Sequence, residues 1–284
     1  MSAFRFDRFG TLGVVQPLRS LVGCRPQGIP ILMYHSISET DEAGIHPYFQ
    51  IATSPTVFSN QMQFLYENGY AAITLSEAAK KLMDGDTNID KVVVITFDDG
   101  FADFYTTAFP ILSRYRFNSV VFLPTAFIAN SPSQFKGIPC LTWSQIKELH
   151  GASVHFGSHT VNHVQLASAT PSVLENEIRY SKETIENTLG CGVESFSYPY
   201  AFPESSHSFR RRLKDILVTA GYKNGVSTII GTAANRHDAF FLPRLPVNTW
   251  DDSRLLYAKL KGDYNWLHAP QYLKKLTILT TVQG

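Results

Sequence analysis

Two adjacent carboxylates, Asp98 and Asp99, follow a run of β-branched residues in the stretch KVVVITFDDG at Lys91–Gly100. The segment Val92–Ile95 is apolar and β-branched, which predicts a buried strand. Strands of this kind occur in parallel sheets, where ligands bind at the carboxyl ends of the strands. Because successive side chains point in different directions, one carboxylate could bind a metal while its neighbour faces the reacting atom.

Two histidines, His159 and His163, lie further along the chain in the stretch FGSHTVNH at Phe156–His163. Their spacing allows one turn of helix, or a tight loop, to aim both imidazoles at one point. Together with Asp99 they would supply two nitrogens and one oxygen and leave positions open for water and substrate, as a catalytic metal site requires. A metal held there is a Lewis acid and lowers the pKa of its bound water to about 7. Asp98 would then be the general base.

Each of these motifs also has an ordinary structural interpretation. A pair of aspartates after a strand commonly caps a helix or forms a turn. Two histidines at this spacing arise readily by chance in a chain with nine histidines. Both motifs occur in order, and each follows a predicted strand, so their combination favours the metal site.

Four short stretches resemble one known family. TFDDG at Thr96–Gly100 and SHTVNH at Ser158–His163 resemble the first two motifs of the polysaccharide deacetylases, the NodB-type carbohydrate esterases of family 4. FSYPY at Phe196–Tyr200 matches the position of the third motif. YHS at Tyr34–Ser36 is similar to the subgroup that includes bacterial poly-N-acetylglucosamine deacetylases. The resemblance extends over Pro30–Val247.

The resemblance implies both a reaction and the residues that carry it. In that family a divalent metal, usually zinc, is bound by the second aspartate and the two histidines, here Asp99, His159 and His163. The first aspartate, here Asp98, is the base, and the enzymes hydrolyse N-acetyl groups on sugar polymers. Tyr200 occupies the motif position whose backbone N–H holds the oxyanion.

Two departures from the family pattern affect the expected site. The usual third motif carries an arginine that orients the base, and the stretch Ser197–Tyr200 has none. Arg244, in LPRLPV, could replace it or could form a surface ion pair, and the two interpretations are held equal. The usual Leu-x-His near the C-terminus is also missing, since Leu267 and His268 are adjacent. In the subgroup with the YH pair the histidine of the first strand is the general acid, which nominates His35, with His268 as the competitor.

Strand-like and helix-like segments alternate from Ile29 onward. Alternating units of this kind imply a parallel sheet, and the resemblance implies an α/β fold that is a distorted, incompletely closed (β/α) barrel. All the candidate site residues then fall at the carboxyl ends of strands. Besides Val92–Ile95, the predicted strands are Ile29–His35, Ala71–Leu75, Ser119–Pro124, Ser153–Gly157, Ser195–Tyr198, Gly225–Thr228 and Leu242–Val247. The predicted helices are Pro55–Asn68, Ser76–Met83, Asp103–Tyr115, Trp143–Leu149, Pro171–Leu189 and Phe209–Ala220.

Local signals predict where several helices begin and end. Ser76 is expected to cap one helix, and Thr142 to open another with a capping box. Thr170 is the expected N-cap of the longest helix, which should end at Gly190. Pro110 should kink the helix that contains it.

Composition and length bound the class of protein. A chain of 284 residues with 44% apolar and 17% charged residues predicts one globular domain, residues 29–284, with a helical C-terminal extension and an N-terminal extension over residues 1–28. A net charge of +1 gives no electrostatic argument for a nucleic-acid partner. The three cysteines, Cys24, Cys140 and Cys191, are too few and too widely spaced for a disulfide framework and favour a reducing compartment.

The N-terminus has neither a membrane-spanning stretch nor a continuous apolar region of the signal-peptide type. We therefore expect a cytoplasmic protein or one peripheral to the membrane. Aromatic and aliphatic residues alternate with arginines there and could form an amphipathic segment, either on a membrane or, the favoured alternative, packed on the protein's own surface. These apolar residues are Phe4, Phe6, Phe9, Leu12, Val15 and Leu18.

The motifs predict a catalytic metal site, and the family resemblance implies metal-dependent, most plausibly zinc-dependent, hydrolysis of N-acetyl groups on an N-acetylhexosamine polysaccharide or its precursor, in exopolysaccharide synthesis. Two loops, Glu39–Ser54 and Asn130–Cys140, are long enough to contact substrate. The alternatives are a non-sugar amide, peptidoglycan or chitin as substrate, and an inactive carbohydrate-binding protein. Retention of both aspartates and both histidines argues against the inactive protein. The oligomeric state stays open.

Overall fold

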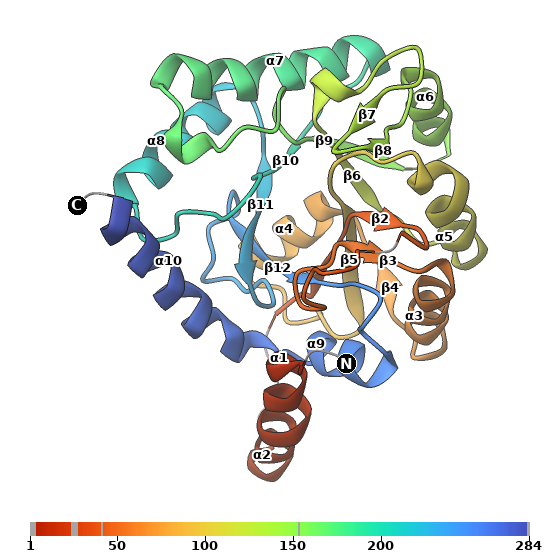
Figure 1. Ribbon diagram of the computed structural model, residues 1–284, viewed down its shortest axis with the longest axis vertical. Coiled ribbons are helices and arrows are strands. Elements are labelled where there is room, and N and C mark those ends of the chain that lie inside the picture. Colours follow the sequence, from red (N-terminus) through yellow and green to blue (C-terminus); the bar gives the residue numbers. More distant parts are fainter. Residues whose placement is uncertain (1–3, 24–27, 41, 153, 283–284) are drawn as a thin grey trace.

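Seven parallel strands close into a ring in the computed structural model of the protein, which describes residues 4–23, 28–40, 42–152 and 154–282 (Figure 1). The order around the ring is β1-β12-β11-β10-β9-β6-β5, and β5 pairs again with β1. The strands are β1 (Ile31–Tyr34), β5 (Val92–Phe97), β6 (Val120–Leu123), β9 (His155–Ser158), β10 (Ser195–Ser197), β11 (Asn224–Ile230) and β12 (Leu242–Pro246).

The barrel is closed, so the expectation of an incompletely closed barrel is wrong. Four consecutive pairs of residues join β1 to β5, from Ile31 with Val94 to Tyr34 with Phe97. The other edge of β1 pairs with β12 at Leu32 and Met33. β1 therefore hydrogen-bonds on both sides, and the ring has no free strand edge there.

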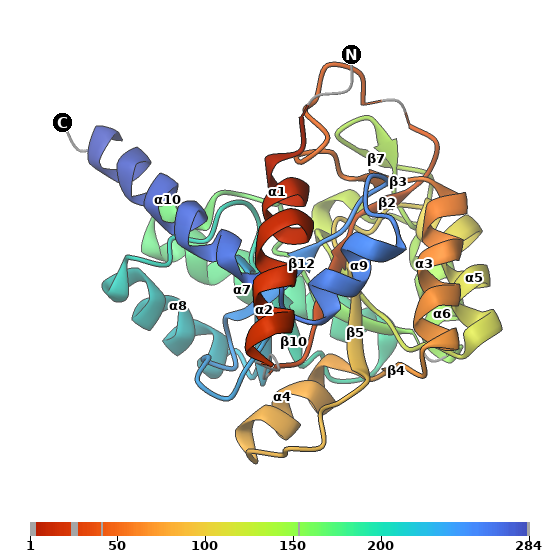
Figure 2. The same cartoon turned by 90° about the horizontal axis from the view of Figure 1, so that it is seen from below.

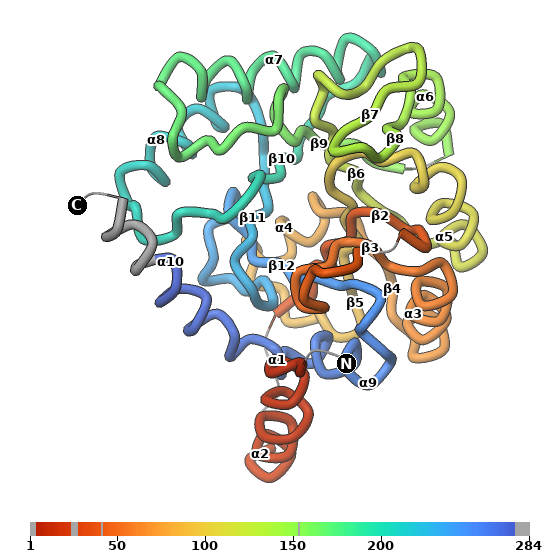
Figure 3. The backbone as a smooth tube through the Cα atoms, in the orientation of Figure 1, coloured from red at the N-terminus to blue at the C-terminus, as the bar shows by residue number. Residues whose placement is uncertain are grey.

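Helices surround the ring, and most strands are followed by a helix outside the ring before the chain returns, as Figure 3 traces; β11 and β12 are joined without a helix in the described residues. The longer helices are α3 (Pro55–Glu67), α4 (Leu75–Met83), α5 (Phe109–Tyr115), α6 (Trp143–Gly151), α7 (Pro171–Leu189), α8 (His207–Thr219), α9 (Ser253–Leu260) and α10 (His268–Val282). A helix at the N-terminus consists of α1 (Phe6–Phe9), a π-helical segment (Gly10–Val15) and α2 (Gln16–Val22). The predicted boundary at residue 28 stays a prediction, and Cys24 and Ser153, named above, lie outside the described residues.

The two ends of the barrel differ in what covers them. Figure 1 looks through the ring at α4, and Figure 2 shows α4 below the strands. Apolar residues of α4, including Leu75, Ala78 and Leu82, form one buried cluster with barrel residues such as Ile31 and Val94. The opposite end, where the strands finish, carries two small sheets. These sheets are β2 (Ser36–Ile37) with β3 (Ala52–Thr53), and the hairpin of β7 (Gln134–Phe135) with β8 (Ile138–Pro139).

The interior of the barrel is filled by large side chains, and one of them requires a glycine beside it. Phe122 of β6 is fully buried. A Cβ on Gly157 of β9 would lie 2.5 Å from two ring atoms of Phe122 and 2.8 Å from a backbone oxygen. The glycine just before the histidine motif is therefore needed for the two strands to pack.

The helix signals hold with two corrections. Thr142 forms the expected capping box with Gln145, and α7 runs from the Thr170 cap to Gly190, whose φ is +70°. Thr74 rather than Ser76 caps α4, because Glu77 lies three residues after Thr74 and completes a capping box.

Pro110 does not kink one continuous α-helix. Residues Phe104–Ala108 form a π-helical segment, and α5 begins at Phe109. Pro110 then lies in the first turn of α5, directly after the π-helical segment, so the hydrogen-bonding pattern of the helix changes next to the proline. β4 (Ala71–Ala72) hydrogen-bonds to the start of β5 outside the ring.

Candidate active site

Three side chains that the sequence predicted as metal ligands come together at the strand ends of the barrel. Nε2 of His163 lies 3.2 Å and Nε2 of His159 lies 3.5 Å from Oδ1 of Asp99. All three residues are buried, and their ligand atoms lie within 4.8 Å of one another. A search of the described residues for three or more histidine, cysteine or acidic side chains that could hold one metal ion finds this group.

Local backbone geometry directs the aspartate into this position. Asp99 has a φ of +70° and Gly100 a φ of +61°, so the chain turns sharply as it leaves β5. Asp tolerates the left-handed region better than most residues, and glycine adopts it freely. A Cβ on Gly100 would also lie 3.0 Å from Leu123, so this turn packs closely against the end of β6.

The two histidines are presented by a tight loop rather than a helix. Thr160 and His163 both have positive φ, and the His163 N–H donates to Oγ1 of Thr160 at 3.0 Å. The carboxylate of Glu177 on α7 accepts hydrogen bonds from the N–H groups of Val161 and Asn162 and from the Asn162 side chain. Sequence reasoning missed Glu177, although the sequence places this acid next to the predicted apolar face of α7, three residues after Leu174, and an acid in that position is a detectable signal.

The tautomer of His159 follows from its partner. Nδ1 lies 2.8 Å from the carbonyl oxygen of Ser197, and a carbonyl only accepts, so Nδ1 carries the hydrogen. The lone pair of Nε2 then points toward Asp99, as in metal sites where a backbone carbonyl orients the histidine. Burial lowers the pKa of His159 to about 4, against the raising effect of Asp98, so the ring is neutral near pH 7, the form that binds metals.

The three residues fit a divalent cation. Oδ1 of Asp99 is buried and has no hydrogen-bond donor among the described residues, although two imidazole nitrogens face it. A buried polar atom without a partner is costly, and a cation between these atoms would satisfy all three. The donor set of two nitrogens and one carboxylate oxygen suits a first-row divalent metal.

The second aspartate, Asp98, is held by Arg244. The guanidinium of Arg244 donates to both carboxylate oxygens, at 2.8 and 2.7 Å, and both residues are buried. Its remaining contacts fix the guanidinium itself: Nε donates to the carbonyl of Ser227, and the terminal nitrogens donate to the hydroxyls of Thr96 and Ser197. Arg244 is therefore not a surface ion pair, and its location matches the interpretation in which it takes the place of the missing arginine.

The charge of Asp98 follows from these contacts. Burial alone would raise the pKa of this carboxyl, but Arg244, and after it His159 and His35, outweigh burial and hold the pKa below its ordinary value. Asp98 is thus a buried carboxylate that stays ionised near neutral pH.

His35 and His268, the two candidates for the general acid, lie in different surroundings. His35 directly follows β1, and the N–H of Asp98 donates to the carbonyl of Tyr34 beside it. Burial lowers the pKa of His35, while the charges of Asp99 and Asp98 raise it, so both carboxylates act on this ring. His268 starts α10, and its Nε2 lies 2.9 Å from both carboxylate oxygens of Glu204.

Tyr200 and Lys136 flank the three candidate metal-binding residues on the outer side. Tyr200 has a φ of +59°, and its half-exposed ring lies edge-on to His163 with ring centroids 4.6 Å apart. Lys136, in the turn between β7 and β8, places Nζ 3.7 Å from Oδ2 of Asp99 and 4.5 Å from the centroid of the Phe135 ring. The loop Asn130–Cys140 was expected to contact substrate, but Lys136 itself was not singled out.

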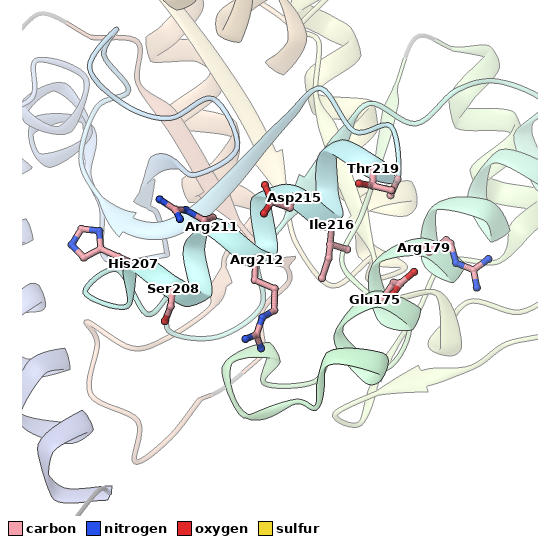
Figure 4. Close-up of a pocket in the computed structure, with 10 residues that line it drawn as sticks. Glu175, Arg179, His207, Ser208, Arg211, Arg212, Asp215, Ile216 and Thr219 are labelled. Carbon is pink, nitrogen blue, oxygen red and sulfur yellow. The ribbon is translucent and has the colours of Figure 1, made fainter.

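One groove of the described surface lies away from this site. It runs between α7 and α8 and carries both arginines and acidic side chains (Figure 4). None of the candidate site residues lines it. Its lining includes Glu175, Arg179, His207, Arg211, Arg212 and Asp215.

Comparison with known proteins gives one consistent family. The sequence model of the polysaccharide deacetylases matches residues 85–224, which include both aspartates and both histidines but not His35 or Arg244. YxkH of Bacillus subtilis strain 168, which is assigned to the polysaccharide deacetylases, is 30% identical over 226 residues, covering 79% of this chain and 73% of that protein.

Two further relatives have more specific names. The poly-beta-1,6-N-acetyl-D-glucosamine N-deacetylase of Escherichia coli K12 is 31% identical over 174 residues, which are 56% of this chain and 25% of that enzyme. The solved structure of the Streptococcus pyogenes deacetylase PplD, in complex with acetate, matches with a TM-score of 0.72 at 28% identity, covering 83% of this chain and 99% of that one.

Proposed function

Because this chain belongs to the polysaccharide deacetylase family, whose members hydrolyse N-acetyl groups, we propose that it removes acetyl groups from an N-acetylhexosamine polysaccharide or its precursor. One observation carries the proposal: a buried cluster of Asp99, His159 and His163 lies beside a second aspartate that Arg244 holds ionised. In this proposal Asp99 is a metal ligand and Asp98 is the general base.

Asp99, His159 and His163 would hold a divalent metal, and zinc is the ion we propose because it suits imidazole and carboxylate ligands. When bound, such a metal supplies a Lewis acid for water activation and for the acetyl carbonyl. The chain's own contribution is orientation. Ser197 fixes the His159 tautomer, and Glu177 holds the loop that presents His163.

Asp98 would accept a proton from the attacking water. Oδ1 of Asp98 accepts hydrogen bonds from Arg244 and from the Ser197 hydroxyl. Oδ2 accepts one hydrogen bond, from Arg244, in the described contacts and keeps a further lone pair for that proton. The two contacts with Arg244 fix the plane of the carboxylate, so the base is positioned before substrate binds. A positioned general base typically contributes about 10²–10⁴-fold to the rate.

His35 would donate a proton to the nitrogen that leaves as the amine. It lies beside β5 at the end of β1, and both carboxylates act on it. The Glu204 partner of His268 and its place at the start of α10 support His35 over His268. The backbone N–H of Tyr200 is proposed to hold the oxyanion, in line with its position in the third motif.

The proposed substrate is an exopolysaccharide, or a lipid-linked precursor of one, built from N-acetylhexosamine. Exposed aromatic rings are available at this end of the barrel, since Tyr200 is half-exposed and Phe49 of the loop Glu39–Ser54 is largely exposed. Such rings stack on sugar faces. The poly-N-acetylglucosamine specificity of the E. coli relative supports this substrate class.

An assay of acetate release tests the proposal. Oligomers of β-1,6-linked N-acetylglucosamine should release acetate, and short acyl amides without a sugar should not. Chitin oligomers and peptidoglycan fragments serve as the nearest competing substrates. Preference for the small amide would refute the substrate while leaving the metal chemistry intact, and no acetate from any sugar would refute the activity.

Crystallography tests the metal independently of turnover. An anomalous signal at the zinc edge should lie about 2.0–2.2 Å from side-chain atoms of Asp99, His159 and His163. A peak bound elsewhere, with these three residues unliganded, would contradict the proposed site.

A further inference from the structure

The helix at the N-terminus packs against the rest of the protein through polar side chains. Asp7 is 4% exposed and accepts hydrogen bonds from Arg5 and, at 2.7 Å, from the hydroxyl of Tyr264. Thr11 is fully buried and accepts from the indole N–H of Trp266 at 3.0 Å. A surface helix normally buries its apolar stripe, whereas this helix turns polar residues toward the protein.

Two ion pairs extend the polar contact along the helix. Arg8 pairs with Asp252 at 2.7 Å, and Arg19 pairs with Asp263 at 3.3 Å. The contact is close, because a Cβ on Gly10 would lie 2.5 Å from the Trp266 ring. The inward side of this helix therefore has specific partners from the first turn to the last.

The apolar residues of the same helix point outward and form one stripe. Phe9 and Val14 are five residues apart, and the π-helical segment Gly10–Val15 between them has more residues per turn than an α-helix. That segment keeps both residues on the outer face, whereas a regular α-helix would rotate Val14 away. The outward residues are Phe6, Phe9, Val14, Leu18, Leu21 and Val22, each 45–85% exposed.

We expected the apolar residues of this segment to pack on the protein's own surface. The helix does pack there, but mostly with its polar residues inward, and among the apolar ones Leu12 joins the core while Phe6 touches Trp266. Figures 1 and 2 show the helix along the outside of the barrel, with α2 extending beyond the ring in Figure 1. Contiguous exposed apolar surface of this kind marks an interaction site.

The charged residues around the stripe indicate what kind of surface it would bind. The acidic residue in residues 4–23 is Asp7, which is buried, whereas Arg8 and Arg19 are each about one-third exposed. Phe4 and Phe9 also line a hollow beside the stripe, together with Trp250, Arg254 and Asp252. The apolar stripe carries no carboxylate of its own, and in the adjoining hollow Arg5, Arg8 and Arg254 outnumber the carboxylate of Asp252. Exposed Phe, Leu and Trp side chains with such a basic flank match an interfacial helix on anionic lipid.

We propose that the outward stripe of this helix binds the surface of an anionic lipid membrane. The polar inward face holds the helix on the barrel, so the apolar side chains enter the headgroup region while the catalytic domain stays outside it. This inference does not depend on the proposed hydrolysis, and activity on soluble oligomers should not require it.

Vesicle flotation tests the proposal with matched variants. The first combines Phe9→Ser, Leu18→Ser and Leu21→Ser, and the control combines Met83→Ser, Val218→Ser and Tyr66→Ser, which remove apolar side chains of similar exposure from other faces. The probes are vesicles of phosphatidylcholine with phosphatidylglycerol, and of phosphatidylcholine alone. Circular dichroism and acetate release on a soluble oligomer report on folding.

The wild type and the control should float with the phosphatidylglycerol vesicles and more weakly with phosphatidylcholine alone. The partition coefficient of the stripe variant onto the vesicles should be at least about tenfold lower, because burying one such side chain changes an equilibrium constant by about tenfold or more. A wild type that stays in solution would overturn the proposal. So would equal binding by the stripe variant, or a wild-type dimer that the stripe variant converts to a monomer, since the stripe would then cover a second copy.

Discussion

Replacing Arg244 by lysine keeps a positive charge near Asp98 but removes the planar group that contacts both carboxylate oxygens. The guanidinium makes two contacts with Asp98, at 2.8 and 2.7 Å, and a third with the carbonyl of Ser227 at 3.0 Å. A lysine ammonium cannot reproduce this bidentate geometry. Hydrogen bonds to charged groups contribute about 1.5–3 kcal/mol each. Losing one of them in the transition state should lower kcat/KM by about ten- to hundredfold.

Arg244→Met removes the charge as well, and its effect on pH dependence separates positioning from simple folding. Because Arg244 holds the pKa of Asp98 below its ordinary value, losing it should raise that pKa. The acidic limb of kcat/KM, measured by acetate release, should then move to higher pH. A residue needed only for folding would lower the amount of active enzyme without moving the limb.

Lys259→Met is the matched control. Lys259 is a buried cation paired with Asp251 at 2.7 Å, and neither residue contacts Asp98 or the three proposed ligands in the described contacts. Its loss should cost stability, as breaking a buried pair does, but leave the acidic limb in place. An Arg244→Met enzyme with a wild-type rate and an unmoved limb would refute the assigned role.

Three other substitutions have expected outcomes. Asp98→Asn should keep the metal, measured by elemental analysis, and lose about 10²–10⁴-fold in turnover; normal activity or loss of the metal would contradict its role as base. His35→Ala should lose most activity and His268→Ala should keep it, and the reverse pattern would transfer the acid role to His268. Asp7→Asn should lower the free energy of unfolding by about 3 kcal/mol near neutral pH, since it leaves Arg5, whose side chain is 9% exposed, with fewer partners. Burial alone would raise the pKa of Asp7, but the hydrogen bonds from Arg5 and Tyr264 outweigh burial, so the pKa lies below its ordinary value. The stabilisation is therefore present above about pH 3.9 and is lost as the pH falls. In urea denaturation the stabilities of the wild type and the variant should converge in acid, and a constant difference would contradict the reasoning.

The sequence was sufficient where the signal is local. The β-branched run before Asp98 predicts β5. Alternating βα units predict a parallel sheet with Asp99, His159 and His163 at the carboxyl ends of its strands, and the family resemblance adds that the sheet forms a barrel. Thr142 and Thr170 carried complete capping signals and mark the observed helix starts. Ser76 is a suitable cap by residue type alone, but Glu77 lies three residues after Thr74 and completes a capping box there.

The sequence was insufficient where the deciding partner is distant in the chain. Closure depends on the register of β1 against β5, which no local pattern encodes. The direction of Arg244 depends on its contacts with residues of three other strands. The N-terminal apolar pattern suggested an inward apolar face, but the partners that bury Asp7 and Thr11 instead are Tyr264 and Trp266, at the other end of the chain.

Acetate release from β-1,6-linked N-acetylglucosamine oligomers, followed before chelation, after chelation and after zinc is restored, tests the central claim most directly. The buried lone pairs of Asp99, His159 and His163 require a cation for the proposed reaction, so release should stop on chelation and return with zinc. Acetate release at an unchanged rate from the metal-free protein would contradict the account.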